Sequence, residues 1–76
     1  MIKYGTLTYN FESDRYSVRI AEDNRERHID LHCGDPLAVF MNEECKDTRI
    51  EMNMAEEWYF VGLGCDPKLG SRIKLY

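Results

Sequence analysis

The residues that could bind a metal ion or attack a substrate are few in this chain and lie far apart in the sequence. They are His28, His32, Cys33, Cys45 and Cys65. Zinc sites usually show ligands in close pairs such as Cys-x-x-Cys, and the sequence contains no such pair. The two histidines share one face of a predicted strand, but a solvated polar face explains the same spacing. We therefore expect no metal site and no cofactor.

No group of residues shows the pattern of a catalytic site. Cys33 follows His32 directly, and neighbouring residues of a strand point to opposite faces, so the two are badly placed to form a thiolate–imidazole pair. Cys33 is in phase with Ile29 and Leu31, which predicts a small buried side chain. Paired-acid catalysis needs two carboxylates at a fixed separation in a cleft, whereas the carboxylates here are predicted to lie in turns and on solvated faces. We therefore predict no catalytic residue and no enzyme activity.

Aromatic residues beside charged ones are the clearest sign of a binding surface in this sequence. Residues 47–53 and 58–63 are β-rich and flank a short polar step, which is the pattern of a β-hairpin. A loop with an even number of residues pairs Ile50 with Val61, and an odd loop pairs Ile50 with Phe60. A slip of one residue exchanges the two faces of a strand. The two registers therefore place different residues in the core.

We predict the even register because it buries more apolar residues together. Its core face carries Thr48, Ile50, Met52, Tyr59, Val61 and Leu63. Trp58, Phe60, Arg49 and Glu51 then share the outer face, and aromatic residues with arginine are typical anchors of protein interfaces. We predict that these four residues bind a protein partner. The alternative is that a neighbouring loop or a bent strand covers the two rings, because small barrels often bury both faces of a central strand.

A second candidate surface is basic. In the last predicted strand, Arg72, Lys74 and Tyr76 share the outward face, and Lys3 would lie near them if the first and last strands are neighbours in a barrel. Basic residues with interleaved tyrosines can bind single-stranded nucleic acid by stacking. Protection of a sheet edge by lysine and arginine accounts for the same residues. Nucleic-acid binding is therefore the alternative function.

Short strands have to position all of these residues. Alternation of apolar and polar residues predicts strands over residues 2–10, 15–20, 27–33, 37–42, 47–53, 58–63 and 72–76. In the first hairpin, a turn at residues 11–14 pairs Tyr9 with Tyr16 and Leu7 with Val18. The pattern predicts an all-β fold, a small SH3-like, half-open barrel of about five to seven short antiparallel strands in a single domain over residues 1–76.

Two further connections are predicted from their composition. Residues 21–26 are rich in charge and have no apolar stripe, so we predict a loop there. Residues 43–46 are predicted to form an acidic turn before the central hairpin. We therefore predict that neither connection is part of a strand.

Length, charge and cysteine content narrow the class of protein. The chain has 76 residues and a formal net charge of −4, which argues against a general nucleic-acid binder. Three cysteines cannot all pair within one chain, and the first residues lack the apolar core of a signal peptide. The apolar runs are too short to span a bilayer. We therefore expect a cytoplasmic protein with reduced thiols and no membrane contact.

The order of several short motifs resembles a small family of bacterial proteins that is classed as a domain of unknown function. Its members come from Gram-positive gut and soil bacteria and their mobile elements, and the resemblance runs over nearly the whole chain. It implies no activity and no catalytic residues, and the strand order is also similar to that of SH3-like barrels. The matching motifs are Gly5-x-Leu7-x-Tyr9-Asn10, Arg15-Tyr16-x-Val18, Leu31-His32-Cys33-Gly34, Thr48-Arg49-Ile50-Glu51-Met52, Trp58-Tyr59-x-Val61-Gly62-Leu63 and Leu69-Gly70-x-Arg72-Ile73.

These observations lead to one expected function and one alternative. We expect a non-enzymatic interaction module that binds a protein partner through an exposed aromatic and arginine patch. Such a patch could also be covered in a homodimer. The alternative is a nucleic-acid-associated accessory protein of a mobile element.

Overall fold

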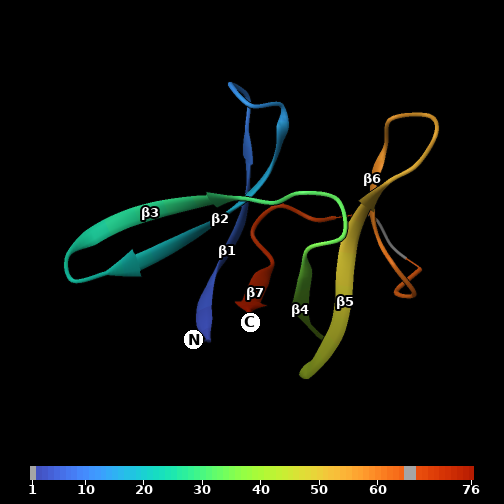
Figure 1. Ribbon diagram of the computed structural model, residues 1–76. Helices are drawn as coiled ribbons and strands as arrows, with labels where there is room; N and C mark the ends of the chain where they lie inside the picture. The colour runs from blue at the N-terminus through green and yellow to red at the C-terminus, as the bar shows by residue number, and fades with distance from the viewer. Residues whose placement is uncertain (1, 65–66) are drawn as a thin grey trace.

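Seven antiparallel strands make up the fold of this chain (Figure 1). The computed structural model describes residues 2–64 and 67–76, and within these ranges it contains no helix. The all-β fold predicted from sequence is therefore confirmed. The strands are β1 (Lys3–Asn10), β2 (Arg15–Glu22), β3 (Arg25–Asp30), β4 (Pro36–Met41), β5 (Glu44–Met52), β6 (Trp58–Phe60) and β7 (Arg72–Leu75).

The last strand joins two three-stranded meanders into one sheet. The strand order is β3-β2-β1-β7-β4-β5-β6, so β7 lies between β1 and β4 and is antiparallel to both. This arrangement confirms the prediction that the first and last strands are neighbours. It also places the side chains of β7 at the middle of the sheet.

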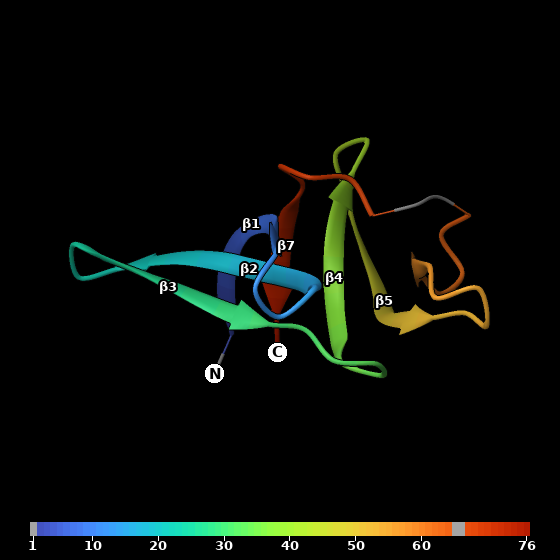
Figure 2. The same cartoon turned by 90° about the horizontal axis from the view of Figure 1, so that it is seen from above.

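The sheet curls into a half-open barrel that a single connection helps to hold. Figure 2 shows β2 and β3 running outward together as a long hairpin, while residues 31–35 pass from β3 toward β5. The Leu31 N–H donates a hydrogen bond to the Tyr16 carbonyl at 2.8 Å, and the Gly34 N–H donates to the Ile50 carbonyl at 2.8 Å. The connection therefore links both meanders across the opening. The inner face of the sheet holds the core, which consists of Leu7, Val18, Ile20, Leu31, Leu37, Val39, Ile50, Phe60 and Ile73.

The register of the first hairpin agrees with its prediction. Leu7 lies opposite Val18, and Tyr9 lies opposite Tyr16, across the turn at residues 11–14. The two tyrosine rings meet edge to face with centroids 5.0 Å apart. Alternation was enough here because the buried apolar residues of the two strands, Leu7 in β1 and Val18 and Ile20 in β2, all lie on one face.

The next two hairpins correct the predicted loop at 21–26 and the predicted turn at 43–46. The β2–β3 turn consists of Asp23-Asn24, and the β4–β5 turn consists of Asn42-Glu43, with positive φ at all four residues. Two-residue turns with positive φ match the twist of antiparallel strands. The strands therefore continue almost to the turn, and residues predicted as loop form ladder hydrogen bonds.

Two residues differ from their predicted burial near the end of β3. This strand ends at Asp30 and not at Cys33, so Cys33 lies in the connection and is exposed. Alternation along residues 15–20 predicts that Ser17 faces outward, yet it is fully buried, and its hydroxyl donates a hydrogen bond to the Asp30 carboxylate. Asn10 donates a second bond to the same oxygen at 3.2 Å. These bonds favour the ionised carboxyl and lower the pKa of Asp30.

Candidate functional site

The β5–β6 hairpin adopts the odd register, so the prediction of the even register was wrong. Ile50 lies opposite Phe60, and Met52 lies opposite Trp58. Ile50 is fully buried and Phe60 is 3% exposed, whereas Tyr59, predicted to be core, is 38% exposed. Phe60 therefore faces the core and Tyr59 faces outward, which is the reverse of the prediction for β6.

The loop of this hairpin explains the odd register. The Asn53 N–H donates to the Glu57 carbonyl at 2.9 Å, which leaves three residues, 54–56, at the tip. The Asn53 Oδ1 atom accepts hydrogen bonds from the N–H groups of Ala55 and Glu57 at 2.9 and 3.0 Å. Glu56 closes the loop with φ of 62°. Three-residue loops of this kind usually carry glycine at that last position. Because position 56 is a glutamate, nothing in the sequence indicated a loop of three residues.

The predicted partner-binding patch of Trp58, Phe60, Arg49 and Glu51 does not form one surface. Phe60 is a core residue, and the half-buried Trp58 packs against the core. Arg49 and Glu51 lie on the outer side of β5, where their side chains pair at 3.2 Å. The guanidinium of Arg15 lies over the Trp58 ring at 6.0 Å and donates to the Leu31 carbonyl at 3.1 Å. Trp58 thus stabilises the closure of the barrel.

The basic surface predicted from Lys3, Arg72, Lys74 and Tyr76 forms in part. Lys3 lies opposite Leu75, on the inner side of the sheet, and pairs with the Glu22 carboxylate. That pairing lowers the pKa of Glu22. Lys3 therefore does not share a face with the other three residues, because alternation along β1 turns it away from them.

The other three residues are joined by two aromatic side chains that the sequence prediction did not include. Tyr4 of β1 lies opposite Lys74, and Phe40 of β4 lies two residues beyond Ala38, which is also opposite Lys74. Both side chains therefore flank β7 on its outer side. We refer to this surface as the aromatic–cationic face, which consists of Tyr4, Phe40, Arg72, Lys74 and Tyr76.

Contacts within the aromatic–cationic face place cations against rings. The Arg72 guanidinium carbon is 5.7 Å from the Tyr4 ring centroid and 5.9 Å from that of Phe40. The two ring centroids are 6.2 Å apart at an interplanar angle of 46°. The Lys74 ammonium is 5.0 Å from the Tyr76 centroid. These distances are those of cation–π contacts.

The rings of the aromatic–cationic face are open to solvent, and its cations have no carboxylate partner among the described residues. Tyr4 is 47% exposed, Phe40 37% and Tyr76 54%. Within residues 2–64 and 67–76, neither Arg72 nor Lys74 forms an ion pair with a carboxylate. Many acidic side chains lie instead in or beside the hairpin turns, namely Glu12, Asp14, Glu22, Asp23, Glu43, Glu44, Glu56 and Glu57. These turns hold much of the negative charge of the chain, whereas Asp47 is an acidic side chain that contacts the face, at Tyr76.

Among the described residues, Tyr76 is the aromatic residue of the face whose side chain forms a hydrogen bond. Its hydroxyl donates a hydrogen bond to the Asp47 carboxylate. That bond, together with the negative charge of Asp47, raises the pKa of Tyr76 to about 12. The phenol is therefore neutral at physiological pH and fixed at one edge of the face.

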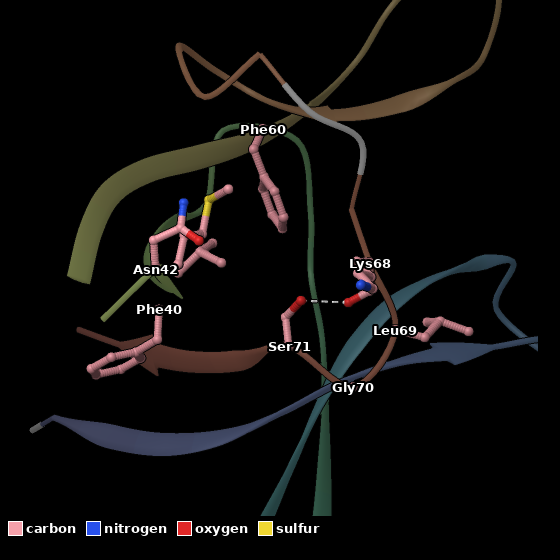
Figure 3. Close-up of a pocket in the computed structure, with 9 residues that line it drawn as sticks. Phe40, Asn42, Phe60, Lys68, Leu69, Gly70 and Ser71 are labelled. Atoms are coloured by element: carbon pink, nitrogen blue, oxygen red, sulfur yellow. Dashed lines mark hydrogen bonds between the residues drawn. The ribbon is translucent and has the colours of Figure 1, made fainter. Parts of the chain in front are cut away.

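A cavity of about 430 Å³ lies between the β4 and β6 strands and the segment before β7, and Phe40 of the aromatic–cationic face is one of its lining residues (Figure 3). Phe60 points into it, and the Ser71 hydroxyl donates to the Lys68 carbonyl at 2.7 Å along its rim. Among the described residues that line it, Lys68 is the only ionisable one. The cavity therefore lacks a second titratable group for acid–base chemistry, as far as the described residues extend.

Three other features bear on the remaining predictions. The described part of the chain contains no cluster of three side chains that could hold a metal ion. It also has no helix long and apolar enough to cross a membrane. Cys33 and Cys45 are exposed free thiols, and Cys65 lies outside the described residues.

Comparisons with known proteins place the chain in a family without indicating an activity. The profile of DUF5348, described as a domain of unknown function, matches residues 5–75. A crystal structure of a protein from Ruminococcus gnavus is similar over 96% of this chain and 100% of that one, with 33% identity and a TM-score of 0.78. A search of curated proteins gives no match. The resemblance to a family of unknown function, predicted from the motifs, is thus confirmed.

Proposed function

This chain belongs to the DUF5348 family, and we propose that it is a non-enzymatic module that binds an anionic partner through its aromatic–cationic face. The observation that carries the proposal is the position of Arg72, which lies between the exposed rings of Tyr4 and Phe40 without a carboxylate partner among the described residues. A cation held against rings in this way is available to a ligand that brings negative charge.

The composition of the face supports binding. Tyrosine and arginine are enriched among the residues that dominate the free energy of protein interfaces, because they bury large areas and can also form hydrogen bonds. On this face they project from adjacent strands of one sheet, so their positions are fixed by backbone pairing. A partner therefore meets a largely preformed surface, which lowers the entropy cost of association.

The place of action is also part of the proposal. We propose a cytoplasmic location, which Cys33 and Cys45 support because both are free and exposed. Thiols of this kind persist where glutathione and thioredoxin keep them reduced.

The test is a capture experiment with two matched double variants. A tagged chain is incubated with extract of the source cells, and bound protein and nucleic acid are both identified. Tyr4→Ala with Arg72→Ala changes the aromatic–cationic face, and Tyr59→Ala with Arg49→Ala makes the same chemical changes on another exposed part of the sheet. Circular dichroism confirms that both variants remain folded.

We expect the partner to be lost by the Tyr4 and Arg72 double variant and retained by the Tyr59 and Arg49 double variant. Loss by the second variant alone would move the binding surface to the β5–β6 hairpin. Equal retention by both variants would refute the proposal.

A further inference from the structure

We infer that the ligand of the aromatic–cationic face is single-stranded nucleic acid, with bases stacking on Tyr4 and Phe40 and phosphates contacting Arg72 and Lys74. This inference rests on the proposed function, because it names the partner of the same face. Three features of the face favour this ligand: the exposed rings, cations that have no carboxylate partner among residues 2–64 and 67–76, and the groove beside them.

The rings are the first ground. Tyr4 and Phe40 project from the outer side of a sheet, and each is more than a third exposed. Base–aromatic stacking on a sheet surface is a common way to hold single strands, because every base has a π-face. In a duplex these base faces are stacked on one another, so exposed rings favour an unpaired strand.

The cations are the second ground. Arg72 contacts both rings, so a base stacked on either ring would bring its own phosphate within reach of the guanidinium. Lys74 lies on the same side of β7 and two residues further along it. Phosphates of the strand would supply the negative charge that the described residues do not provide to these cations.

A groove beside the face is the third ground. A shallow groove of about 310 Å³ on the outer side of the sheet is lined by Tyr4, Thr6, Arg19 and Arg72, and also by the acidic Glu26. Arg19 lies opposite Thr6 across β1 and β2, and only a long contact of 3.9 Å joins it to Glu26. The groove therefore leads from Arg72 to a third cation, along a path that a phosphate backbone could follow.

The net charge of −4 is compatible with this inference. The acidic side chains of the hairpin turns lie at the ends of the strands, whereas Arg72 and Lys74 lie in the central strand of the sheet. Charges further apart than the Debye length, about 8 Å at physiological ionic strength, are largely screened. Local positive potential can therefore persist in a chain that is acidic overall.

The test measures binding of fluorescein-labelled oligothymidylate and oligouridylate by anisotropy over a range of salt concentrations, with a labelled duplex as comparison. We expect the single strands to bind more tightly than the duplex. Two or three phosphate contacts should give a slope of log K against log salt of about −1.4 to −2. Tyr4→Ala and Phe40→Ala should each weaken binding about 5- to 150-fold, and Phe40→Tyr should restore most of it.

Charge-matched variants locate the phosphate contacts. Arg72→Gln should make the salt slope shallower by about 0.7. Arg25→Gln makes the same change in net charge at the tip of the β2–β3 hairpin and should leave the slope unchanged. Equal effects of these two variants would overturn the inference, as would duplex binding that matches or exceeds single-strand binding.

The two proposals fail in different ways. If the oligonucleotides do not bind while the capture experiment yields a protein that depends on Tyr4 and Arg72, the binding face stands and the nucleic-acid ligand is wrong. If neither experiment depends on these residues, both proposals are wrong.

Discussion

Ile50 and Phe60 lie directly opposite each other in the β5–β6 pairing, and both side chains are buried in the core. This relationship fixes which face of β6 points inward. It removes Phe60 from any surface and leaves Tyr59 on the outer side of the sheet. Exposed rings in contact with a cation are therefore found beside β7, at Tyr4 and Phe40, and not at Phe60 of the β5–β6 hairpin.

Replacement of Phe60 tests this register. Phe60→Ala should lower the free energy of unfolding by about 3–5 kcal/mol, because it removes a large buried ring. Tyr59→Ala should cost less than about 1 kcal/mol, since Tyr59 is 38% exposed. Urea unfolding measures both values. The even register predicts the reverse order, so a larger loss for Tyr59→Ala would refute the pairing.

The β4–β5 turn offers a stabilising substitution. Glu43 has φ of 65°, a conformation that costs a residue with a side chain about 1–2 kcal/mol. Glu43→Gly should therefore raise the free energy of unfolding by about 0.5–1 kcal/mol, after the greater chain entropy of glycine is subtracted.

Glu44 provides the matched control for this substitution, because it is the next residue but lies within β5, opposite Met41. Glu44→Gly should destabilise the protein by about 0.5–1 kcal/mol. Chemical denaturation of both variants measures the effects. The assignment of the turn to Asn42-Glu43 would be wrong if both substitutions changed stability in the same direction.

Asp30 should make the stability of the protein depend on acid pH. Hydrogen bonds from Ser17 and Asn10 lower the pKa of its carboxyl in the folded state. A lowered pKa adds stability above the ordinary aspartate value of about 3.9, and this contribution is lost as pH falls through the lower folded value.

Ser17→Ala should therefore reduce stability at neutral pH and flatten the part of the pH dependence that lies below about pH 4. Asp30→Asn should flatten the same region, because the group no longer ionises. Urea unfolding at a series of pH values measures both effects. A constant difference between wild type and Ser17→Ala over this range would contradict the assigned hydrogen bond.

Tyr76 should ionise only in strongly alkaline solution. Its protonated hydroxyl donates to Asp47, which raises the pKa to about 12. The stability from this bond is thus present below pH 10 and is lost as pH rises through about 12. Asp47→Asn should return the pKa toward 10, the ordinary tyrosine value. An NMR titration of the Tyr76 ring measures the shift, and an identical titration in both proteins would show that the bond does not form.

The alternation of apolar and polar residues predicted the pairing of strands correctly where the strands and their turn carried clear local signals. The pairing of Tyr9 with Tyr16 follows from alternation on both sides of a four-residue turn. The later turns were missed or displaced because Asn24, Glu43 and Glu56 occupy positive-φ positions that glycine more often fills. Without those glycines, the loop lengths and the β5–β6 register had no sequence signal.

Of the candidate site, only the part that lies at the C-terminal strand could be predicted from the sequence. Alternation in β7 placed Arg72, Lys74 and Tyr76 on one face, as the structure has them. Tyr4 and Phe40 joined them because β1 and β4 are the neighbours of β7. Such long-range pairing depends on how the whole sheet assembles, and no pattern within a single strand specifies it.

The position of β7 also bears on how the protein is made. A ribosome completes β1 and β4 long before it reaches Arg72–Leu75, the strand that pairs with both. Until then, the nascent chain carries two strands whose facing edges have no partner, and open edges can pair with other chains. Translation therefore leaves the two halves of this barrel vulnerable to aggregation until its last strand has left the ribosome.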